Sequence, residues 1–282
     1  MFRKVLVPLD GSEVSARILT FLEPIIELKG ASIVALSVES DPPPGPQGEA
    51  SGAWSQGVDA LQRQSAAVSA IRRQGDPAEE ILAVACSEGV SLIAMSTHGR
   101  TGISRLVRGS VAERVLRSAD TPVLLVNPFT KPHAQDSQIS RILVPLDRSA
   151  TSAAVIPEVA QLAQAYSSHV TLFHVANPEL HESPMAERRE TERDKVFREQ
   201  AAIHVRQLAE AGVQATVKVV FEFGAAAQIL AAVEDQAIDL VALTTHGRSG
   251  MSRWLFGSVA EHVIRQCRAP LLVKRIAEAE SR

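Results

Sequence analysis

The sequence has few aromatic residues, few cysteines and little net charge, and each of these shortages limits what kind of protein it encodes. Aromatic residues make up only 4% of the 282 residues while 45% are hydrophobic, so we predict an aliphatic core. The formal net charge of −3 argues against a general nucleic-acid binder, which usually has a basic excess. Cys86 and Cys267 are isolated, so we predict buried or half-buried free thiols in a reducing compartment and no metal site.

Long apolar runs are also missing from the sequence, and we expect no leader segment. No apolar stretch has the length needed to cross a bilayer, and the first four residues run straight into a strand-like segment. We therefore expect a cytoplasmic protein that has no membrane or nucleic-acid partner. The length is enough for about two domains.

The chain does contain an internal repeat. Residues 4–10 (KVLVPLD) recur as residues 141–147 (RILVPLD), and residues 97–126 align without a gap to residues 245–274, with 16 identical positions. The offset between the copies is 137 at the first pair of segments and 148 at the second, so the second copy is 11 residues longer between them. A repeat of this length predicts two similar domains.

The predicted domains comprise residues 1–127 and 139–282, joined by a linker at 128–138. The linker is polar and contains Pro128 and Pro132, a composition that cannot build a core. The second copy gains its extra length in the middle, where residues 185–211 have a charged, helix-like period. In the first copy residues 41–57 are rich in Pro, Gly and Ser, so we predict a loop there and only a short helix near 58–64. Its segment Pro42–Pro46 is a candidate lid, with disorder as the equal alternative.

Strands and helices are predicted to alternate along each copy, most clearly along the second. The expected strands of that copy are 141–146, 170–175, 215–223, 240–244 and 270–274, and the other expected helices are 150–166, 225–236 and 258–266. This alternation predicts an α/β fold: two tandem, doubly wound domains, each with a five-stranded parallel sheet between helices. Ligands of such sheets bind beyond the carboxyl ends of the strands.

The first motif with chemical meaning ends the first strand of each copy. Pro8 and Asp10 precede Ser12, and Pro145 and Asp147 precede Ser149. An aspartate at the carboxyl end of a strand can accept hydrogen bonds from a ribose or an adenine amino group. Asp and Ser are also good helix N-caps, and the sequence leaves both interpretations open.

The second motif is a Gly-Ser pair that opens a helix in each copy. Gly99 is followed by nine residues and then Gly109-Ser110, and Gly247 is followed by nine residues and then Gly257-Ser258. Free amides at a helix N-terminus bind anions, and glycine lets the backbone approach phosphate oxygens. Identical spacing in both copies favours a phosphate cradle over a simple turn. Arg100 and Arg248 could complement phosphates or remain solvated, and we interpret His98 and His246 as structural loop residues.

Together these motifs closely resemble the universal stress proteins, and the whole chain resembles their tandem-domain form. ATP-binding members contain Gly, two residues, Gly, nine residues, Gly and then Ser or Thr. The resemblance assigns the aspartate to Asp10 and Asp147 and the adenine-reading backbone to the vicinity of Val38 and Val175. The first glycine of the motif is replaced by a side chain in both copies, which puts the affinity in doubt. The candidate nucleotide contacts are Pro8, Asp10, Val38, Ser96, Gly99, Arg100, Gly109, Ser110, Pro145, Asp147, Val175, Thr244, Gly247, Arg248, Gly257 and Ser258.

The resemblance implies a non-enzymatic ATP-binding protein of the stress response. The ligand is expected to be ATP, with AMP or ADP as alternatives, and Mg²⁺ or Mn²⁺ held by its phosphates rather than by protein ligands. No Walker A sequence, Ser/His/Asp order or metal-ligand cluster indicates an enzyme, so no catalytic residue is assigned. A slow ATPase and an interaction module with empty sites remain the alternatives. The strands at 123–126 and 271–274 are expected to pair the copies as a dimer within one chain, and a homodimer is a further expectation.

Overall fold

The computed structural model describes residues 2–26, 31–39, 48–64, 67–97, 110–131, 138–176, 192–246 and 257–276. The chain divides into two compact units. Unit 1 comprises Met1–Ser137 with Pro270–Arg275, and unit 2 comprises Gln138–Ala269 with Ile276–Arg282. No helix among the described residues has both the length and the apolar character that a membrane crossing requires.

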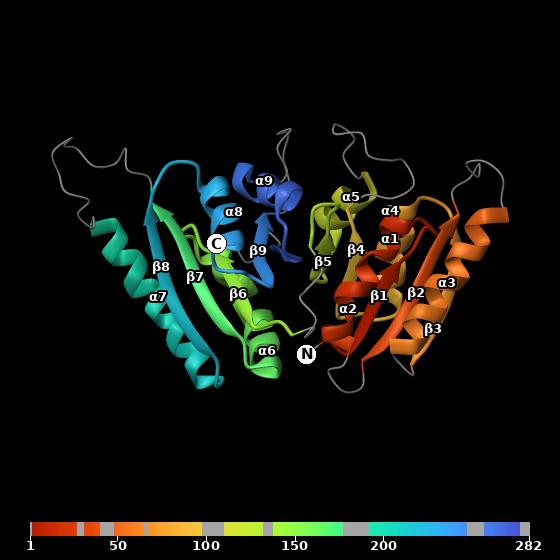
Figure 1. Cartoon of the computed structure of the whole chain (residues 1–282), viewed down its shortest axis with the longest axis horizontal. Helices are drawn as coiled ribbons and strands as arrows, with labels where there is room; N and C mark the ends of the chain where they lie inside the picture. Colours follow the sequence, from red (N-terminus) through yellow and green to blue (C-terminus); the bar gives the residue numbers. More distant parts are fainter. Residues whose placement is uncertain are drawn as a thin grey trace. The chain divides into compact units, whose positions relative to one another are not determined.

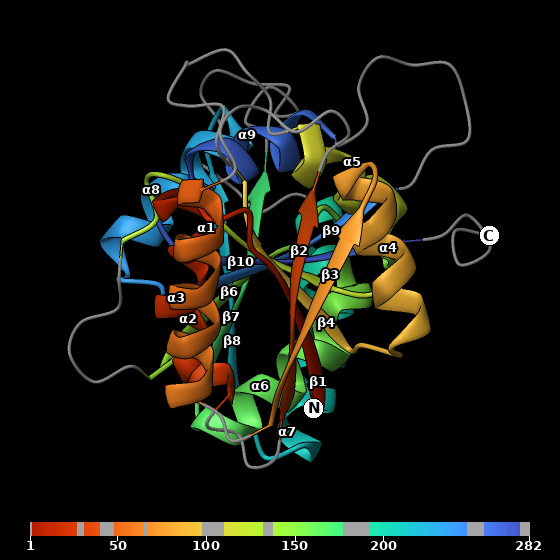
Figure 2. The same ribbon diagram turned by 90° about the vertical axis from the view of Figure 1, so that its right-hand side faces the viewer.

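Unit 1 is a parallel sheet between two layers of helices (Figures 1 and 2). Strands of the first copy lie in the order β3-β2-β1-β4-β5, and all their pairings are parallel. Helices α2 and α3 cover one face of this sheet and α4 covers the other (Figure 2). The elements are β1 (Lys4–Pro8), α1 (Glu13–Ala16), α2 (Ile18–Ile26), β2 (Ser32–Glu39), α3 (Gly48–Gln64), β3 (Val68–Gln74), α4 (Pro77–Ser87), β4 (Leu92–Ser96), α5 (Ser110–Ser118) and β5 (Val123–Val126).

Strand β10 (Leu271–Ile276) also pairs within unit 1, to which residues 270–275 belong. It runs antiparallel to β5, with Leu271 opposite Leu125 and Val273 opposite Val123. These side chains are almost fully buried. The pairing expected for these two apolar strands is therefore present, and it covers the edge that β5 would otherwise expose.

Unit 2 repeats the architecture, with parallel strands in the order β9-β6-β7-β8. Long apolar strands account for this arrangement because Ile142, Leu143 and Val144 of β6 are completely buried, as expected for a strand covered on both faces. The elements are β6 (Arg141–Pro145), the 3₁₀ helix η1 (Ala150–Val155), α6 (Ile156–Tyr166), β7 (His169–Ala176), α7 (Glu192–Glu210), β8 (Gln214–Phe221), α8 (Ala225–Asp235), β9 (Leu240–His246) and α9 (Ser258–Gln266).

The short helix predicted for the first copy is wrong. Helix α3 begins at Gly48 and has 17 residues, close to the 19 of α7, so most of the segment predicted as loop is helical. Gly57 lies within the helix because its backbone packs against the sheet: a Cβ there would stand 3.0 Å from Leu9 Cδ1. Burial of Trp54 and Leu61 offsets the poor helix propensity of glycine. The candidate lid Pro42–Pro46 lies outside the described residues.

The helix predicted over 150–166 is divided in two. A 3₁₀ segment, η1, precedes α6, and the division lies just before Pro157. Proline has no amide hydrogen to donate, so it fits the first turn of an α-helix but not its interior. The predicted helix 185–211 is observed from Glu192 onward, and the residues before it lie outside the described ranges.

The two thiols differ in a way that the sequence did not predict. Cys267 is completely buried, and burial raises the pKa of its thiol to about 11, whereas Cys86 is exposed on α4. Because the thiolate is the reactive form, we expect a disulfide reagent at pH 8 to modify one thiol rapidly in the native protein and the second only after unfolding. Cys86→Ser should remove the rapid phase. Rapid modification of two thiols per native chain would contradict this prediction.

Candidate functional site

Four of the predicted contacts of the first copy come to one edge of unit 1. Asp10 follows β1, Ser96 ends β4, and Val38 lies near the end of β2. Strand β1 pairs in parallel with both β2 and β4, so the carboxyl ends of all three lie together. Pro8 is the last residue of β1 and is half-buried. The sheet topology thus assembles these residues from segments that are far apart in the sequence.

Asp10 organises the turn that leads into the first helix. The backbone amide and the hydroxyl of Ser12 donate to Asp10 Oδ1 over 2.9 and 2.7 Å. Ser12 then caps α1 by accepting a hydrogen bond from the amide of Ser15 at 3.0 Å. The capping function is therefore fulfilled by Ser12, and Asp10 holds Ser12 in place. Gly11 between them has a φ of 79°, the left-handed region that glycine adopts without strain.

The second copy builds the same turn at the edge of unit 2. The amide and hydroxyl of Ser149 donate to Asp147 Oδ1 over 3.0 and 2.5 Å, and Ser149 Oγ accepts from the amide of Ser152 at 3.1 Å. The middle residue here is Arg148, with a φ of 74°. Val175, on β7, and Pro145, at the end of β6, take the places of Val38 and Pro8.

The Gly-Ser pair of the second copy begins a helix as predicted. Gly257 is the N-cap of α9 and provides no side-chain acceptor for the first amides, and Ser258 is the first helical residue. Among the described residues, a Cβ added at Gly257 would find no atom within 4 Å beyond its chain neighbours. Ser110 likewise begins α5. These helix ends therefore have the backbone geometry of an anion-binding site.

Several predicted contacts fall outside the described residues. They lie in the sequence segments 98–109 and 247–256, and they are Gly99, Arg100, Gly109, Gly247 and Arg248. His98, interpreted above as a structural residue, lies in the first of these segments.

Ser96 and Thr244 occupy the position of the first motif glycine. Ser96 is the last residue of β4, and Thr244 lies near the end of β9. Both are half-buried. The hydroxyl of Ser96 lies 3.5 Å from the carbonyl of Ser15, so it has a weak partner within unit 1. The serine side chain thus links β4 to the Asp10 turn.

Sequence reasoning missed His174, a buried residue of β7 that contacts the backbone just before Asp147. Its Nδ1 lies 2.8 Å from the carbonyl of Leu146, the residue before Asp147. Because a carbonyl only accepts, Nδ1 carries the proton. The ring stacks on Phe197 of α7, with centroids 4.2 Å apart and planes at 21°. The only signal in the sequence was a histidine within an apolar strand, next to Val175.

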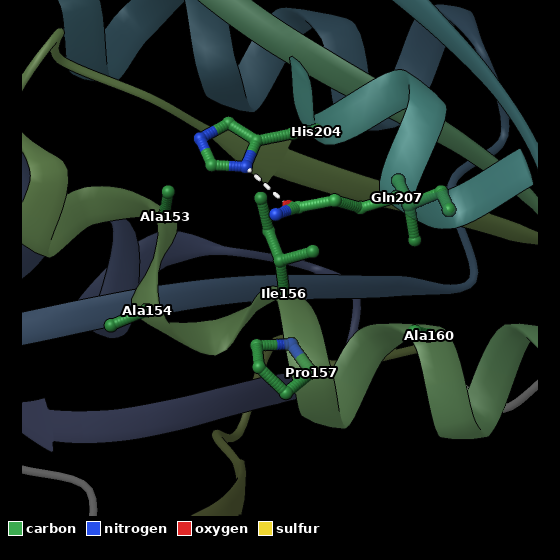
Figure 3. A pocket seen from close by; sticks show the side chains of 8 residues that line it. Ala153, Ala154, Ile156, Pro157, Ala160, His204 and Gln207 are labelled. Carbon is green, nitrogen blue, oxygen red and sulfur yellow. Dashed lines mark hydrogen bonds between the residues drawn. The ribbon is translucent and has the colours of Figure 1, made fainter. Parts of the chain in front are cut away.

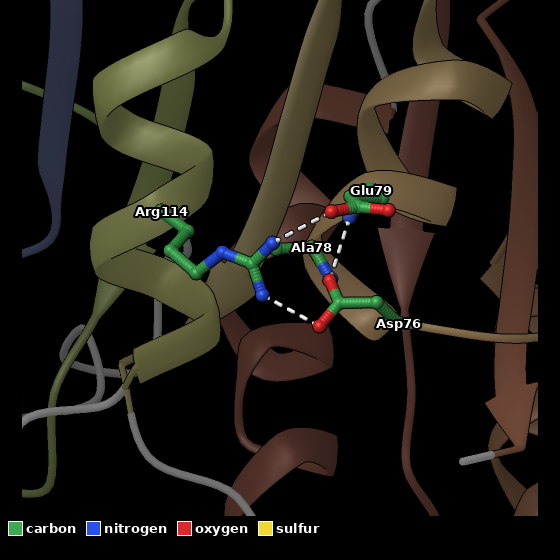
Figure 4. Close-up of polar contacts among 4 residues, drawn as sticks. All are labelled: Asp76, Ala78, Glu79 and Arg114. Atoms are coloured by element: carbon green, nitrogen blue, oxygen red, sulfur yellow. Dashed lines mark hydrogen bonds and ion pairs between the residues drawn. The ribbon is translucent and has the colours of Figure 1, made fainter. Parts of the chain in front are cut away.

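In the first copy, charged side chains interact at the N-terminus of α4 (Figure 4). Asp76 caps α4 by accepting from the amides of Ala78 and Glu79, each at 3.0 Å. Arg114 of α5 donates to Asp76 Oδ2 at 2.5 Å and to Glu79 Oε1 at 3.1 Å. The guanidinium of Arg114 and these amides lower the pKa of the Asp76 carboxyl. In the second copy the N-cap of α8 is Gly224, which makes no side-chain cap bond.

The lowered pKa of Asp76 predicts a pH dependence of stability. Since the folded state favours the charged carboxylate, its contribution is present above an unfolded pKa of about 4 and is lost as the pH falls through the lower folded-state value. Asp76→Asn keeps a capping side chain, so its deficit in unfolding free energy should be small, because the pair is partly exposed, and should shrink as the pH falls through the lowered folded-state pKa of Asp76. Asp76→Ala should cost about 1 kcal/mol more through the lost cap. Denaturant unfolding at pH 7 and pH 3 measures both, and a deficit of Asp76→Asn that grows on acidification would contradict the assignment.

A groove of about 370 Å³ lies elsewhere in unit 2, between η1, α6 and the second half of α7 (Figure 3). Its lining is mainly small and apolar, and its polar part is His204, whose Nδ1 lies 3.0 Å from Gln207 Oε1. It contains none of the predicted nucleotide contacts. Within the described ranges, His, Cys, Asp and Glu side chains form no group of three that could hold a metal ion.

Comparison with known proteins agrees with the repeat and the fold. The sequence model described as the universal stress protein family matches residues 1–127 and 138–275. A universal stress protein of Methanocaldococcus jannaschii is 32% identical over 141 residues, which are 45% of this chain and 82% of that protein. One from Thermus aquaticus is 29% identical over 137 residues, which are 45% of this chain and 99% of that protein. The crystal structure of a universal stress protein from Archaeoglobus fulgidus superposes with a TM-score of 0.74 at 22% identity, covering 98% of this chain and 99% of that one.

Proposed function

The chain belongs to the universal stress protein family in its tandem two-domain form, and from this premise we propose that it is a non-enzymatic adenine-nucleotide-binding protein of the stress response. Each copy provides one candidate site at the carboxyl edge of its sheet. ATP is the preferred ligand, with Mg²⁺ or Mn²⁺ carried by its phosphates.

The observation that supports this proposal best is the repetition of one constellation at the same edge of both units. Each has an aspartate whose Oδ1 is held by a Ser amide and hydroxyl, beside a valine on the adjacent strand. The aspartate can accept from the ribose or from the adenine amino group. In unit 2 helix α9 begins at a glycine whose missing side chain no other described residue crowds, so phosphate oxygens can approach the first amides of the helix.

Equilibrium titration with ATP, followed by a hydrolysis assay on the same sample, tests the proposal. We expect saturable binding of ATP with Mg²⁺ present and no turnover above the rate of free ATP. Saturable binding accompanied by turnover would instead indicate an ATPase. No binding of ATP or AMP at millimolar concentration would contradict the proposal and leave an interaction module.

A further inference from the structure

The second copy is one residue longer than the first just after its third strand. In unit 1 the amide of Gly75 makes the last bond of the β2–β3 pairing, and the next residue, Asp76, already caps α4. In unit 2 the corresponding amide is that of Glu222, and Phe223 follows it before the N-cap Gly224. Phe223 is thus an insertion without a counterpart in the first copy.

The inserted phenylalanine is placed where burial does not account for it. Its side chain is 57% exposed. It follows β8, which pairs with β7, the strand that contains Val175. Glu222 donates its amide to the carbonyl of Ala176, so Phe223 comes one residue after the last bond between these strands. An aromatic face that is open to solvent can stack on a planar base.

A second difference between the copies lies at Arg148. Its φ of 74° is left-handed, a conformation that disfavours an arginine but not the Gly11 that holds the same position, at 79°, in the first copy. The side chain of Arg148 is exposed. The second copy thus retains a strained cation beside Asp147 where glycine would fit without strain, and strain of this kind gathers at binding sites.

These two residues bracket the candidate site of unit 2. The strands lie in the order β9-β6-β7-β8, with Arg148 after β6 and Phe223 after β8. Neighbouring strands are about 5 Å apart, so strands β6 and β8 are about 10 Å apart, with Val175 on the strand between them. Strand β9, which leads towards the Gly257 cradle, lies on the Arg148 side. The base side and the phosphate side of the edge therefore each have one side chain that the first copy lacks.

We propose that Phe223 stacks on the base and Arg148 contacts the phosphates of a nucleotide in unit 2, which makes this the tighter of the two sites. The inference rests on the proposed function, because both residues act on the ligand of that site. Neither contact is available to the first copy, which has Gly11 at one position and no residue at the other.

The test uses the full chain carrying Asp10→Ala, so that titrations report on unit 2, with ATP, adenosine and tripolyphosphate as probes. Phe223→Ala is expected to weaken ATP and adenosine binding about tenfold and to leave tripolyphosphate unchanged, whereas Phe223→Trp retains binding. Arg148→Asn is expected to weaken ATP and tripolyphosphate about tenfold and to leave adenosine unchanged. Asparagine tolerates a left-handed φ, so this variant should unfold at no lower temperature than its parent.

Phe129→Ala and Arg206→Asn are the matched controls, since both side chains are exposed, Phe129 belongs to unit 1 and Arg206 lies in the second half of α7. They should bind all three probes as the parent does. ATP binding that is lost with Asp147→Ala but unchanged by Phe223→Ala and Arg148→Asn would overturn this inference and leave the proposed function intact. If neither the wild-type chain nor the Asp10→Ala parent binds ATP, both the proposed function and this inference are overturned. Equal affinity of the two wild-type sites would also overturn the inference.

Discussion

Gly257→Val is expected to remove nucleotide binding from unit 2 while the protein remains folded. The added side chain would occupy the space through which phosphate oxygens approach the first amides of α9. Two lost hydrogen bonds to a charged group correspond to about 3 kcal/mol or more, a decrease in affinity of about 100-fold. The φ of −49° is open to valine, and in the part of the chain that the structure describes no atom beyond the chain neighbours lies within 4 Å of the new Cβ.

Calorimetric titration with ATP measures the number of sites and the affinity of this variant. Gly109→Val is the matched variant for the first copy, and thermal unfolding of both variants verifies that each is folded. If both variants bind as many nucleotides as wild type with the same affinity, the Gly-Ser cradle is not the phosphate site. If only one of them abolishes binding, the chain has one working site and the other copy is a structural partner.

Asp147→Ala and Asp10→Ala should each weaken binding in their own copy by about 1–3 kcal/mol, because a hydrogen bond to a desolvated partner is lost. The aspartate also holds the serine that caps the next helix, so a loss of affinity could be structural. Asp147→Asn and Asp10→Asn provide the control, because an amide oxygen can still accept from the serine amide.

Ligand analogues identify the group that the aspartate contacts. If it accepts from the ribose, Asp147→Ala should cost much less affinity for 2′,3′-dideoxy-ATP than for ATP. If it accepts from the adenine amino group, the reduced cost should be seen with inosine triphosphate, which has no such group. Equal losses with all three ligands would show that Asp147 acts only through the turn, and the capping interpretation of the motif would then hold.

The sequence predicted the fold well where its signals were local and repeated. Apolar runs such as Ile142–Val144 are buried on both sides of the sheet, and the Gly-Ser pair begins α9 as its spacing indicated. Helix α3 was misjudged because the Pro, Gly and Ser content of residues 41–57, which end at Gly57, was interpreted as a loop. The role of Gly57 is a close contact with Leu9, which is 48 residues away in the sequence and which no local pattern contains.

The candidate site shows the same division. The motifs located Asp10 and Asp147, but not the hydrogen bonds by which each one holds its serine. His174 was missed because its partner, the Leu146 carbonyl, becomes its neighbour only when β6 and β7 pair. Phe223 was missed for a related reason: its status as an insertion is visible only from the register of the strands.

By itself the sequence determined the repeat, the family, the alternation of strands and helices and the residue types at the sheet edge, because these follow from spacing and from hydrophobic period. The tertiary structure alone decided which residues meet at that edge, where glycine allows close packing and where it forms a cap, and how the two copies differ. The physical reason is that strand register, burial and backbone strain arise from contacts between segments that are distant in the chain. The backbone of Arg148 likewise becomes visible only in the structure, since nothing in the sequence marks its left-handed φ.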